Sequence, residues 1–296
     1  MVDLVYVIGS GRSGSTVIER VLNSAPTAFA VGEVHALWRL PMDQLLCSCG
    51  APVADCPFWT EVLSQAGIGP REIADLGKLE HFVVRNRYLA GLRYDIDRIR
   101  QDPRLADFIA LQRQLFAAIR TVSGATTVID SSKAGPRAWV LAAGLDPVFL
   151  HTYRRATDVL TSWRTPKFEP STNSPMKKPS IAEAAGDWVK AEQAARALSR
   201  RAKVCRISYG DFATDPRTAL ARALGAVAGE VLDGVQWTGE ASVAPAAKYH
   251  SVLGNPDRFG KGNIEIRFKR SDPAMLPKMD ALAVRSVGRV LETLWP

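Results

Sequence analysis

The stretch Val5-Tyr6-Val7-Ile8-Gly9-Ser10-Gly11-Arg12-Ser13-Gly14-Ser15-Thr16-Val17-Ile18-Glu19-Arg20-Val21-Leu22 joins an apolar run, a glycine-rich turn and an amphipathic segment. The apolar run predicts a strand, and the apolar residues at 17, 18, 21 and 22 share one face of a helix. Glycines at 9, 11 and 14 let the backbone approach an anion, and the start of a helix presents N–H groups to it. The stretch therefore predicts a strand, a loop and a helix that bind a phosphorylated ligand at residues 11–16.

The loop departs from the ATP-binding pattern G-x-x-x-x-G-K-[ST] at one position. Gly9, Gly14 and Thr16 fit, but Ser15 stands where the pattern has the lysine that reaches the β and γ phosphates. The cation of this loop is Arg12 instead. A kinase or ATPase is therefore disfavoured, and a P-loop nucleotide kinase is kept as the alternative enzyme class. The structural alternative is a glycine-rich turn that binds nothing.

Gly11-Arg12-Ser13-Gly14-Ser15-Thr16 after a strand resembles the phosphosulfate-binding loop of the sulfotransferases that use 3′-phosphoadenosine 5′-phosphosulfate (PAPS). The resemblance implies that PAPS is the co-substrate and adenosine 3′,5′-bisphosphate (PAP) the product. It also implies that the 5′-phosphosulfate is held by Arg12 and by the hydroxyls of Ser15 and Thr16. The loop residues that are expected to contact the co-substrate are Ser10, Gly11, Arg12, Ser13, Gly14, Ser15 and Thr16.

A second stretch, 148–163, again runs from an apolar segment into a helical one and resembles the family's 3′-phosphate site, R-D-P-x-x-x-x-x-S-W. Arg154 and Ser162 occupy the contacting positions, while Arg155 and Ala156 replace the usual Asp-Pro. An arginine suits a phosphate because its planar fork donates to two oxygens at once. The structural alternative for Arg154 is a solvated strand end.

Two further stretches extend the resemblance. Residues 250–259 are similar to an H-x-x-x-G-N-P-x-R-F segment of bacterial members, in which Arg258 is the expected contact to the 3′-phosphate or a clamp over the donor. A surface turn with a stray arginine is the alternative there. Tyr209-Gly210-Asp211-Phe212 is similar to the family's Y-E-D-L stretch and is expected to be scaffold, with Tyr209 counted among the nucleotide contacts.

Sulfuryl transfer needs cations at the leaving phosphate and a base at the acceptor. The resemblance implies a histidine, or a glutamate just after the second strand, and Val31-Gly32-Glu33-Val34-His35 supplies both. Glu33 fits the glutamate position better, so it is the expected base and His35 the second candidate; a helix cap is the structural alternative for Glu33. Asp130-Ser131-Ser132-Lys133 is expected to form a loop after the third strand, in which Lys133 and Ser131 steady the acceptor or the transition-state charge.

Size and hydrophobic patterning predict one α/β domain of 296 residues. Short apolar segments alternate with helical patterns, which predicts a P-loop-like three-layer fold with a central parallel sheet flanked by helices on both faces. The ligand is expected across the carboxyl ends of the strands. The expected strands are 4–8, 29–31, 127–129, 148–152 and 204–207; residues 58–122 are expected to be a helical insertion that walls the acceptor pocket, and 165–180 a mobile loop.

The formal net charge of +8 implies an anionic partner, and PAPS accounts for part of it. The arginines are spread over helical segments without a recognisable binding module, so no nucleic-acid partner is expected. A non-catalytic nucleotide- or nucleic-acid-binding protein is the non-enzymatic alternative, and an acidic acceptor or an anionic membrane surface stays open. With no signal-peptide pattern and no run of about 20 apolar residues, we expect a cytoplasmic enzyme whose acceptor is a hydroxyl of a small molecule, glycan or lipid.

Three of the four cysteines cluster at positions 47, 49 and 56. The cluster suggests zinc, but no second C-x-x-C pair follows, and a fourth ligand is evident only if His35 folds back, so no metal is expected. The pattern C-x-C-G…C-P-F-W resembles an insertion in bacterial sulfotransferases, which implies a packed loop or a local disulfide.

Overall fold

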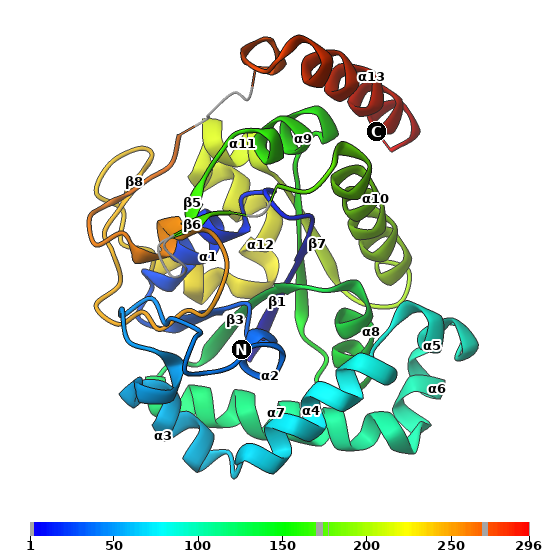
Figure 1. Ribbon diagram of the computed structural model, residues 1–296. Coiled ribbons are helices and arrows are strands. Elements are labelled where there is room, and N and C mark those ends of the chain that lie inside the picture. The colour runs from blue at the N-terminus through cyan, green and yellow to red at the C-terminus, as the bar shows by residue number, and fades with distance from the viewer. Residues whose placement is uncertain (1–2, 170–173, 177, 268–271, 296) are drawn as a thin grey trace.

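The computed structural model describes residues 3–169, 174–176, 178–267 and 272–295 (Figure 1). Its centre is a five-stranded sheet with the order β2-β3-β1-β4-β7, in which all neighbouring strands are parallel. The strands are β1 (Leu4–Gly9), β2 (Ala28–Gly32), β3 (Thr127–Lys133), β4 (Val148–Tyr153) and β7 (Val204–Ser208). All five expected strands are confirmed. The expectation that 130–133 form a loop is wrong, because β3 continues through these residues to Lys133.

Both faces of the sheet are buried, and the alternation of side chains along β1 shows how. Tyr6 and Ile8 belong to one apolar core, while Val5 and Val7 belong to a second core on the opposite face. The first face is covered by α7 (Pro103–Ser123), α8 (Gly135–Gly144) and α10 (Ile181–Leu198). The second face is covered by α1 (Ser15–Asn23), α11 (Tyr209–Thr214) and α12 (Pro216–Asp233). The predicted three-layer α/β fold is therefore confirmed.

The chain between β2 and β3 is mostly helical and lies along one side of the molecule (Figure 1). It forms α2 (Ala36–Arg39), a 3₁₀ turn η1 (Val53–Asp55), α3 (Pro57–Gln65), α4 (Pro70–Phe82), α5 (Asn86–Gly91), α6 (Ile96–Gln101) and α7. The longest of them, α7, begins where the Asp102 side chain accepts the N–H of Arg104, and it ends at Gly124 with a φ of 75°. That this segment walls an acceptor pocket stays a prediction.

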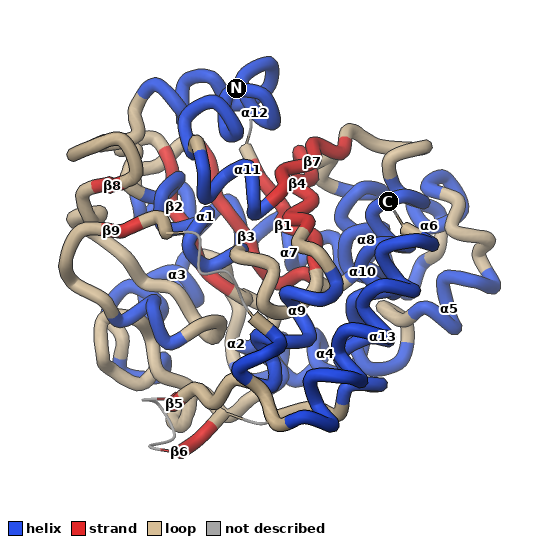
Figure 2. Tube along the Cα trace, turned by 90° about the horizontal axis from the view of Figure 1, so that it is seen from above, coloured by secondary structure: helices blue, strands red, loops and turns tan. Residues whose placement is uncertain are grey.

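The chain after β4 forms α9 (Ala156–Arg164) and a short hairpin of β5 (Phe168–Glu169) and β6 (Ser174–Pro175). Figure 2 shows this hairpin at the periphery of the molecule. The segment expected to be mobile, 165–180, falls partly on 170–173 and 177, which lie outside the described residues. Further on lie β8 (Ser242–Val243), the 3₁₀ turn η2 (Pro256–Phe259), β9 (Ile264–Glu265), the 3₁₀ turn η3 (Pro273–Met275) and α13 (Lys278–Leu294).

Helix α13 packs on α9 and α10 around a small third core that includes Trp188, Val284 and Leu291. Its Glu292 carboxylate accepts the N–H of Thr157 at 2.9 Å and the guanidinium of Arg155 at 2.9 Å. The Glu292 carboxylate, from a helix distant in the sequence, thus caps the start of α9, where Arg155 is the N-cap residue. Within the described part of the chain, no helix has the length and apolar character needed to cross a membrane.

Candidate active site

Candidate residues lie at or just beyond the carboxyl end of each strand of the central sheet. The glycine-rich loop follows β1, Glu33 follows β2, Lys133 ends β3, Arg154 follows β4 and Tyr209 follows β7. In a parallel sheet these ends share one edge, which is where α/β proteins bind their ligands. Residues that are up to 199 positions apart in the sequence are therefore brought to one side of the fold.

The glycine-rich loop turns the chain from β1 into α1 through two left-handed residues, Arg12 with a φ of 70° and Gly14 with a φ of 94°. The Ser13 hydroxyl fixes the turn by a 2.8 Å hydrogen bond to the hydroxyl of Thr152 on β4. The N–H of Val17 makes the first helical bond, to the carbonyl of Gly14. The N–H groups before it lie at the positive end of α1, which favours a bound anion.

The glycines of this loop are packed tightly against other parts of the chain. A Cβ on Gly11 would lie 2.6 Å from the Trp163 ring, and one on Gly14 would lie 2.2 Å from the Tyr209 ring. A Cβ on Gly9 would meet Thr152 at 2.4 Å. Their absent side chains thus make room for aromatic rings and for β4. This is a reason for glycine that the sequence, read for anion binding alone, does not reveal.

Arg12 and Arg154, assigned by the sequence to opposite ends of one nucleotide, meet at this loop. The Arg154 guanidinium donates to the carbonyl of Arg12 at 3.0 Å and lies 4.8 Å from the centre of the Tyr209 ring. The Arg12 guanidinium stacks on the Trp163 ring at 4.6 Å. Burial lowers the pKa of Arg154, and the nearby Tyr209 and Asp158 oppose that effect. Ser162 is half-buried on α9 beside Trp163, and its contact with a nucleotide stays a prediction.

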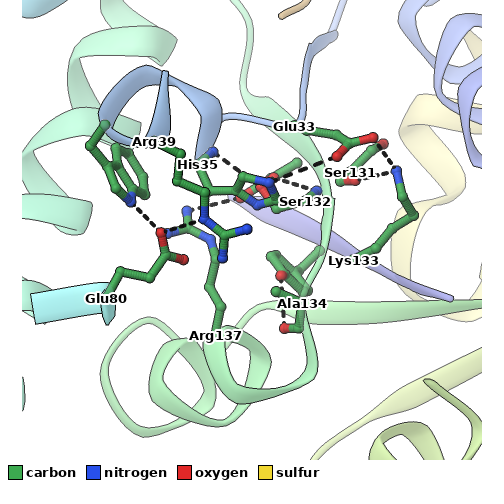
Figure 3. Close-up of polar contacts among 12 residues, drawn as sticks. Glu33, His35, Arg39, Glu80, Ser131, Ser132, Lys133, Ala134 and Arg137 are labelled. Atoms are coloured by element: carbon green, nitrogen blue, oxygen red, sulfur yellow. Dashed lines mark hydrogen bonds and ion pairs between the residues drawn. The ribbon is translucent and has the colours of Figure 1, made fainter. Parts of the chain in front are cut away.

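Glu33 and Lys133 form an ion pair at the ends of two neighbouring strands (Figure 3). The Nζ of Lys133 lies 2.6 Å from the Oε1 of Glu33, and it also donates to the carbonyl of Ser131 at 2.9 Å. The other carboxylate oxygen of Glu33 lies 3.8 Å from the Nε2 of His35. The capping alternative for Glu33 is wrong, because the N-cap of α2 is His35 and no side-chain hydrogen bond caps that helix.

His35 is more deeply buried than Glu33, with 7% against 17% of the side chain exposed. Burial, followed by the charges of Arg39, Arg137 and Lys133, holds the pKa of His35 well below its ordinary value of 6.5. The imidazole is therefore neutral at pH 7. Among the described residues, its Nδ1 has no hydrogen-bond partner. Of the two base candidates, Glu33 is therefore the more exposed to solvent.

Beneath His35 lies a buried ion pair between Arg137 of α8 and Asp130 of β3, with a distance of 3.0 Å. The same Asp130 carboxylate accepts the N–H and the hydroxyl of Ser132, and that hydroxyl in turn accepts the N–H of His35 at 3.3 Å. Both partners of the ion pair are fully buried, so they support the strand end from the inside and do not face a ligand.

Backbone strain gathers at this edge of the sheet. Six non-glycine residues of the described chain have a positive φ, and three of them, Arg12, Lys133 and Leu253, belong to the site segments. Left-handed backbone costs free energy in residues with a side chain and persists only where the surrounding structure fixes it. The strained positions therefore mark the places where the fold holds these three segments in a defined orientation.

The 250–259 loop returns to the glycine-rich loop and to Glu33. The N–H of Asn255 donates to the Thr16 hydroxyl at 3.3 Å, and a Cβ on Gly254 would lie 3.9 Å from the Glu33 carboxylate. Arg258 is 1% exposed and donates to the Gly254 carbonyl at 3.3 Å, so it braces this loop. Its expected contact with the 3′-phosphate stays a prediction.

Two residues of α1 that the sequence analysis did not select also hold this region together. Arg20 donates to the carbonyls of Asp257 at 2.7 Å and Gly260 at 3.0 Å. Glu19 is buried and accepts hydrogen bonds from the hydroxyls of Ser131 and Tyr249. Burial, opposed by these hydrogen bonds and by Lys133, raises the pKa of Glu19 from 4.5 to about 7. On α1, Glu19 lies next to the apolar residues Ile18 and Leu22. An acidic residue with apolar neighbours on a helix is the sequence signal that points to Glu19.

One side of an open cleft is lined by Ala134 and Pro136, which follow Lys133 in the sequence. Its other side is formed by α2 and α4, and both charged and aromatic groups line it. The lining cations are Arg39, Lys78, Arg85, Arg87 and Lys190, and the acidic group is Glu80, which is paired with Arg39 at 3.0 Å.

The clustered cysteines lie outside this set of residues. Cys47, Cys49 and Cys56 are free thiols, so the local disulfide is not present in this structure. The histidine that approaches them is His250 and not His35, the candidate that the sequence offers.

Comparisons with known proteins give weak likenesses. No protein-family model matches the chain, and no curated protein matches it. Among solved structures, the chain is similar to the sulfotransferase domain of the olefin synthase of Synechococcus PCC 7002, with 17% identity over 98% of this chain and 94% of that one and a TM-score of 0.48. It is also similar to the sulfotransferase domain of the curacin biosynthetic pathway, with 14% identity over 95% of both chains and a TM-score of 0.44.

A third solved structure is a sulfotransferase from Mycobacterium avium, with 13% identity over 79% of this chain and 66% of that one and a TM-score of 0.42. Likenesses this weak do not assign an activity or a substrate to this chain.

Proposed function

We propose that this chain is a sulfotransferase that moves a sulfuryl group from PAPS to an acceptor hydroxyl of a small molecule, glycan or lipid and releases PAP. The observation that carries the proposal is the position of two pairs of residues at one sheet edge. Arg12 and Arg154 meet at the glycine-rich loop, and Glu33 and Lys133 pair at the neighbouring strand ends. These residues are the ones that the motifs resembling the PAPS-dependent family select.

The donor would be held by its two phosphorylated ends. The N–H groups at the start of α1, together with Arg12, Ser15 and Thr16, suit the 5′-phosphosulfate, because a helix N-terminus and a guanidinium both favour an anion. Arg154 suits the 3′-phosphate, with Ser162, Tyr209 and Arg258 as further proposed contacts. The hydrogen bond from Arg154 to the Arg12 carbonyl supports this arrangement, since it puts both cations beside one loop.

The proposed reaction is a direct transfer. The acceptor hydroxyl gives its proton to the Glu33 carboxylate, and its oxygen forms a bond to sulfur. The bond between sulfur and the bridging phosphate oxygen breaks, and its electron pair leaves on PAP. Lys133 and Arg12 would stabilise the negative charge that develops in this step. The ion pair of Lys133 with Glu33 supports this assignment, because it holds the base and a cation next to each other.

The cleft lined by Ala134 and Pro136, which follow Lys133 in the sequence, is the proposed approach for the acceptor. Five cationic side chains against one acidic side chain favour an acceptor that carries a negative charge near its hydroxyl. The expected cytoplasmic location is part of the same proposal.

The proposal is tested with the full chain and PAPS. Phenolic, sugar and lipid alcohols, with and without an anionic group, are incubated with PAPS, and the products are analysed by mass spectrometry for the addition of one sulfate. Calorimetry then compares PAP with ATP. Sulfate transfer together with preferential binding of PAP supports the proposal. Tighter binding of ATP favours a kinase, and salt-sensitive binding of DNA or RNA without PAP binding favours the non-catalytic alternative.

A further inference from the structure

Three cysteines and a histidine that the proposed reaction does not use converge on one point. Cys47 and Cys56 are buried, Cys49 is exposed and His250 is half-buried. The ligand atoms of all four lie within 4.8 Å of one another. The Nδ1 of His250 is 3.3 Å from the sulfur of Cys56 and 3.5 Å from that of Cys47, and the sulfurs of Cys49 and Cys56 are 3.8 Å apart.

These separations can be compared with those around a tetrahedral zinc ion. Bonds of about 2.3 Å to sulfur and about 2.0 Å to nitrogen give edges of about 3.8 Å between two sulfurs and about 3.5 Å between sulfur and nitrogen. The observed distances of 3.8 Å, 3.3 Å and 3.5 Å agree with these edges. We propose that Cys47, Cys49, Cys56 and His250 bind one zinc ion through three thiolates and the Nδ1 of the imidazole.

Local structure explains how the short segment 47–56 presents three sulfurs to one point. The N–H of Gly50 bonds to the carbonyl of Cys47 at 2.9 Å, and Gly50 has a φ of 100°, so the chain turns sharply between Cys47 and Ala51. The N–H of Cys47 closes the turn on the carbonyl of Ala51 at 2.9 Å. Cys56 follows as the N-cap residue of α3. The turn and the helix start therefore lie side by side.

The histidine is delivered by a distant segment that pairs with this turn. The N–H of Ser48 bonds to the carbonyl of Ser251 at 2.9 Å, and its hydroxyl bonds to the carbonyl of Tyr249 at 2.8 Å. The His250 ring stacks on Phe58 with centroids 4.8 Å apart and an interplanar angle of 11°. This stacking restricts the rotation of the ring and keeps its Nδ1 directed at the sulfurs of Cys47 and Cys56.

The surrounding charge suits such a site. Three thiolates and a divalent cation sum to a single negative charge, and the Lys261 side chain donates to the carbonyl of Ser48 at 3.5 Å. Four protein ligands leave no open position, which is typical of structural zinc sites and not of catalytic ones. The ion would fasten the 47–56 segment to the loop that carries Gly254 and Arg258, without a part in sulfuryl transfer.

The metal content of the full chain tests the proposal directly. The chain is expressed without an affinity tag that binds metals, and elemental analysis is expected to give about one zinc per chain. Thiols are then counted in denaturant without reductant. A chelator is expected to expose all four cysteines of the chain, since none is in a disulfide. A count of two thiols would show a disulfide and overturn the proposal, and so would a metal-free chain.

Variants identify the ligands. Cys56→Ser, Cys49→Ser and His250→Ala are each expected to lower the retained zinc at least about tenfold under a competing chelator, as is usual for the loss of a ligand or its close support. Cys205→Ser is the matched control, because Cys205 lies on β7 and outside the cluster. Zinc retention by the ligand variants equal to that of Cys205→Ser would overturn the proposal.

Two further measurements keep the outcome clear if a variant does not fold. Cobalt(II) bound to the wild-type chain is expected to give the intense visible bands of a tetrahedral thiolate site, whereas octahedral cobalt bands would overturn the ligand set. PAP binding is measured on the same samples. Zinc without PAP binding would refute the proposed function alone, and PAP binding without zinc would refute the metal site alone.

Discussion

Lys133 and Glu33 are 100 positions apart in the sequence, yet the ammonium of one lies 2.6 Å from the carboxylate of the other. The sheet order explains the pair, because β2 and β3 are neighbours and their parallel register pairs Gly32 with Asp130. Both strands therefore end at the same edge of the sheet. One carboxylate oxygen of Glu33 is occupied by Lys133, and the other lies towards His35.

This pair makes the choice of base testable. Glu33→Gln keeps the size of the side chain but removes the proton acceptor, so it is expected to lower kcat by about 10²–10⁴-fold. PAP affinity should stay nearly unchanged, because Glu33 is assigned to the acceptor hydroxyl and not to a phosphate of the nucleotide. Single-turnover sulfate transfer and calorimetry with PAP measure the two quantities. His35→Ala is the comparison, and an inactive His35 variant beside an active Glu33 variant would show that the base is misassigned.

Arg12 is expected to be required both for transfer and for nucleotide binding. Arg12→Ala removes the cation of the glycine-rich loop and its stacking on Trp163, so transfer should be abolished and PAP binding weakened. Binding is measured by calorimetry at a fixed salt concentration. If PAP bound the variant as tightly as it binds the wild type, Arg12 would not be placed at the phosphate.

Arg154 allows a sharper comparison, because the next residue is also an arginine. Arg154→Ala is expected to weaken PAP binding by about 1.5–3 kcal/mol, the usual size of a hydrogen bond to a charged group. Arg155→Ala is the control, since Arg155 pairs with Glu292 of α13 and has an exposed side chain. The control should reduce thermal stability slightly and leave PAP affinity within about twofold. Equal losses of affinity in both variants would argue against a dedicated phosphate contact at Arg154.

The sequence predicted the layers, the strands and the edge of the sheet that gathers the candidate residues, because each of these follows from local patterns. Alternating apolar segments and helical stretches determine a parallel sheet, and a motif after a strand must lie at its carboxyl end. For the same reason Glu33 was placed correctly after β2.

Contacts between distant segments could not be predicted in this way. The end of β3 was misjudged because Asp130, Ser131 and Ser132 are polar, whereas in the structure they are buried and bonded to Arg137, Glu19 and one another. The sequence does not reveal the partner of the cysteine cluster, because His250 lies 203 positions from Cys47 and 194 from Cys56 and is brought there by the pairing of Ser48 with Ser251.

The tight packing of the glycine-rich loop predicts a cost for any side chain there. Gly11→Ala and Gly14→Ala would place a Cβ 2.6 Å and 2.2 Å from aromatic carbons of Trp163 and Tyr209, and Gly14 also has a left-handed backbone. Each is expected to lower the free energy of unfolding by more than about 1 kcal/mol. Gly186→Ala is the control, because a Cβ there meets nothing within 4 Å in the middle of α10. It should instead stabilise the chain by about 0.5–1 kcal/mol, measured by urea unfolding.

Glu19 makes the free energy of unfolding depend on pH, and the sign of this dependence follows from the shift in its pKa. Burial raises the pKa of its carboxyl from 4.5 to about 7 in the folded chain. Between these values the folded state holds a proton that the unfolded state has lost, so the free energy of unfolding falls as pH rises through this window. A shift of this size corresponds to about 3 kcal/mol at most, all of it lost above about pH 7.

Glu19→Gln isolates this contribution, because the amide stays neutral at every pH and still reaches the hydroxyls of Ser131 and Tyr249. Urea unfolding of both proteins from pH 5 to pH 8 gives the difference in the free energy of unfolding. The free energy of unfolding of the variant, relative to that of the wild type, is expected to increase steadily as pH rises. This difference should level off above about pH 7. A difference that does not change with pH would mean that Glu19 is ionised in the folded chain throughout, and that its contacts with Ser131 and Tyr249 are those of a carboxylate.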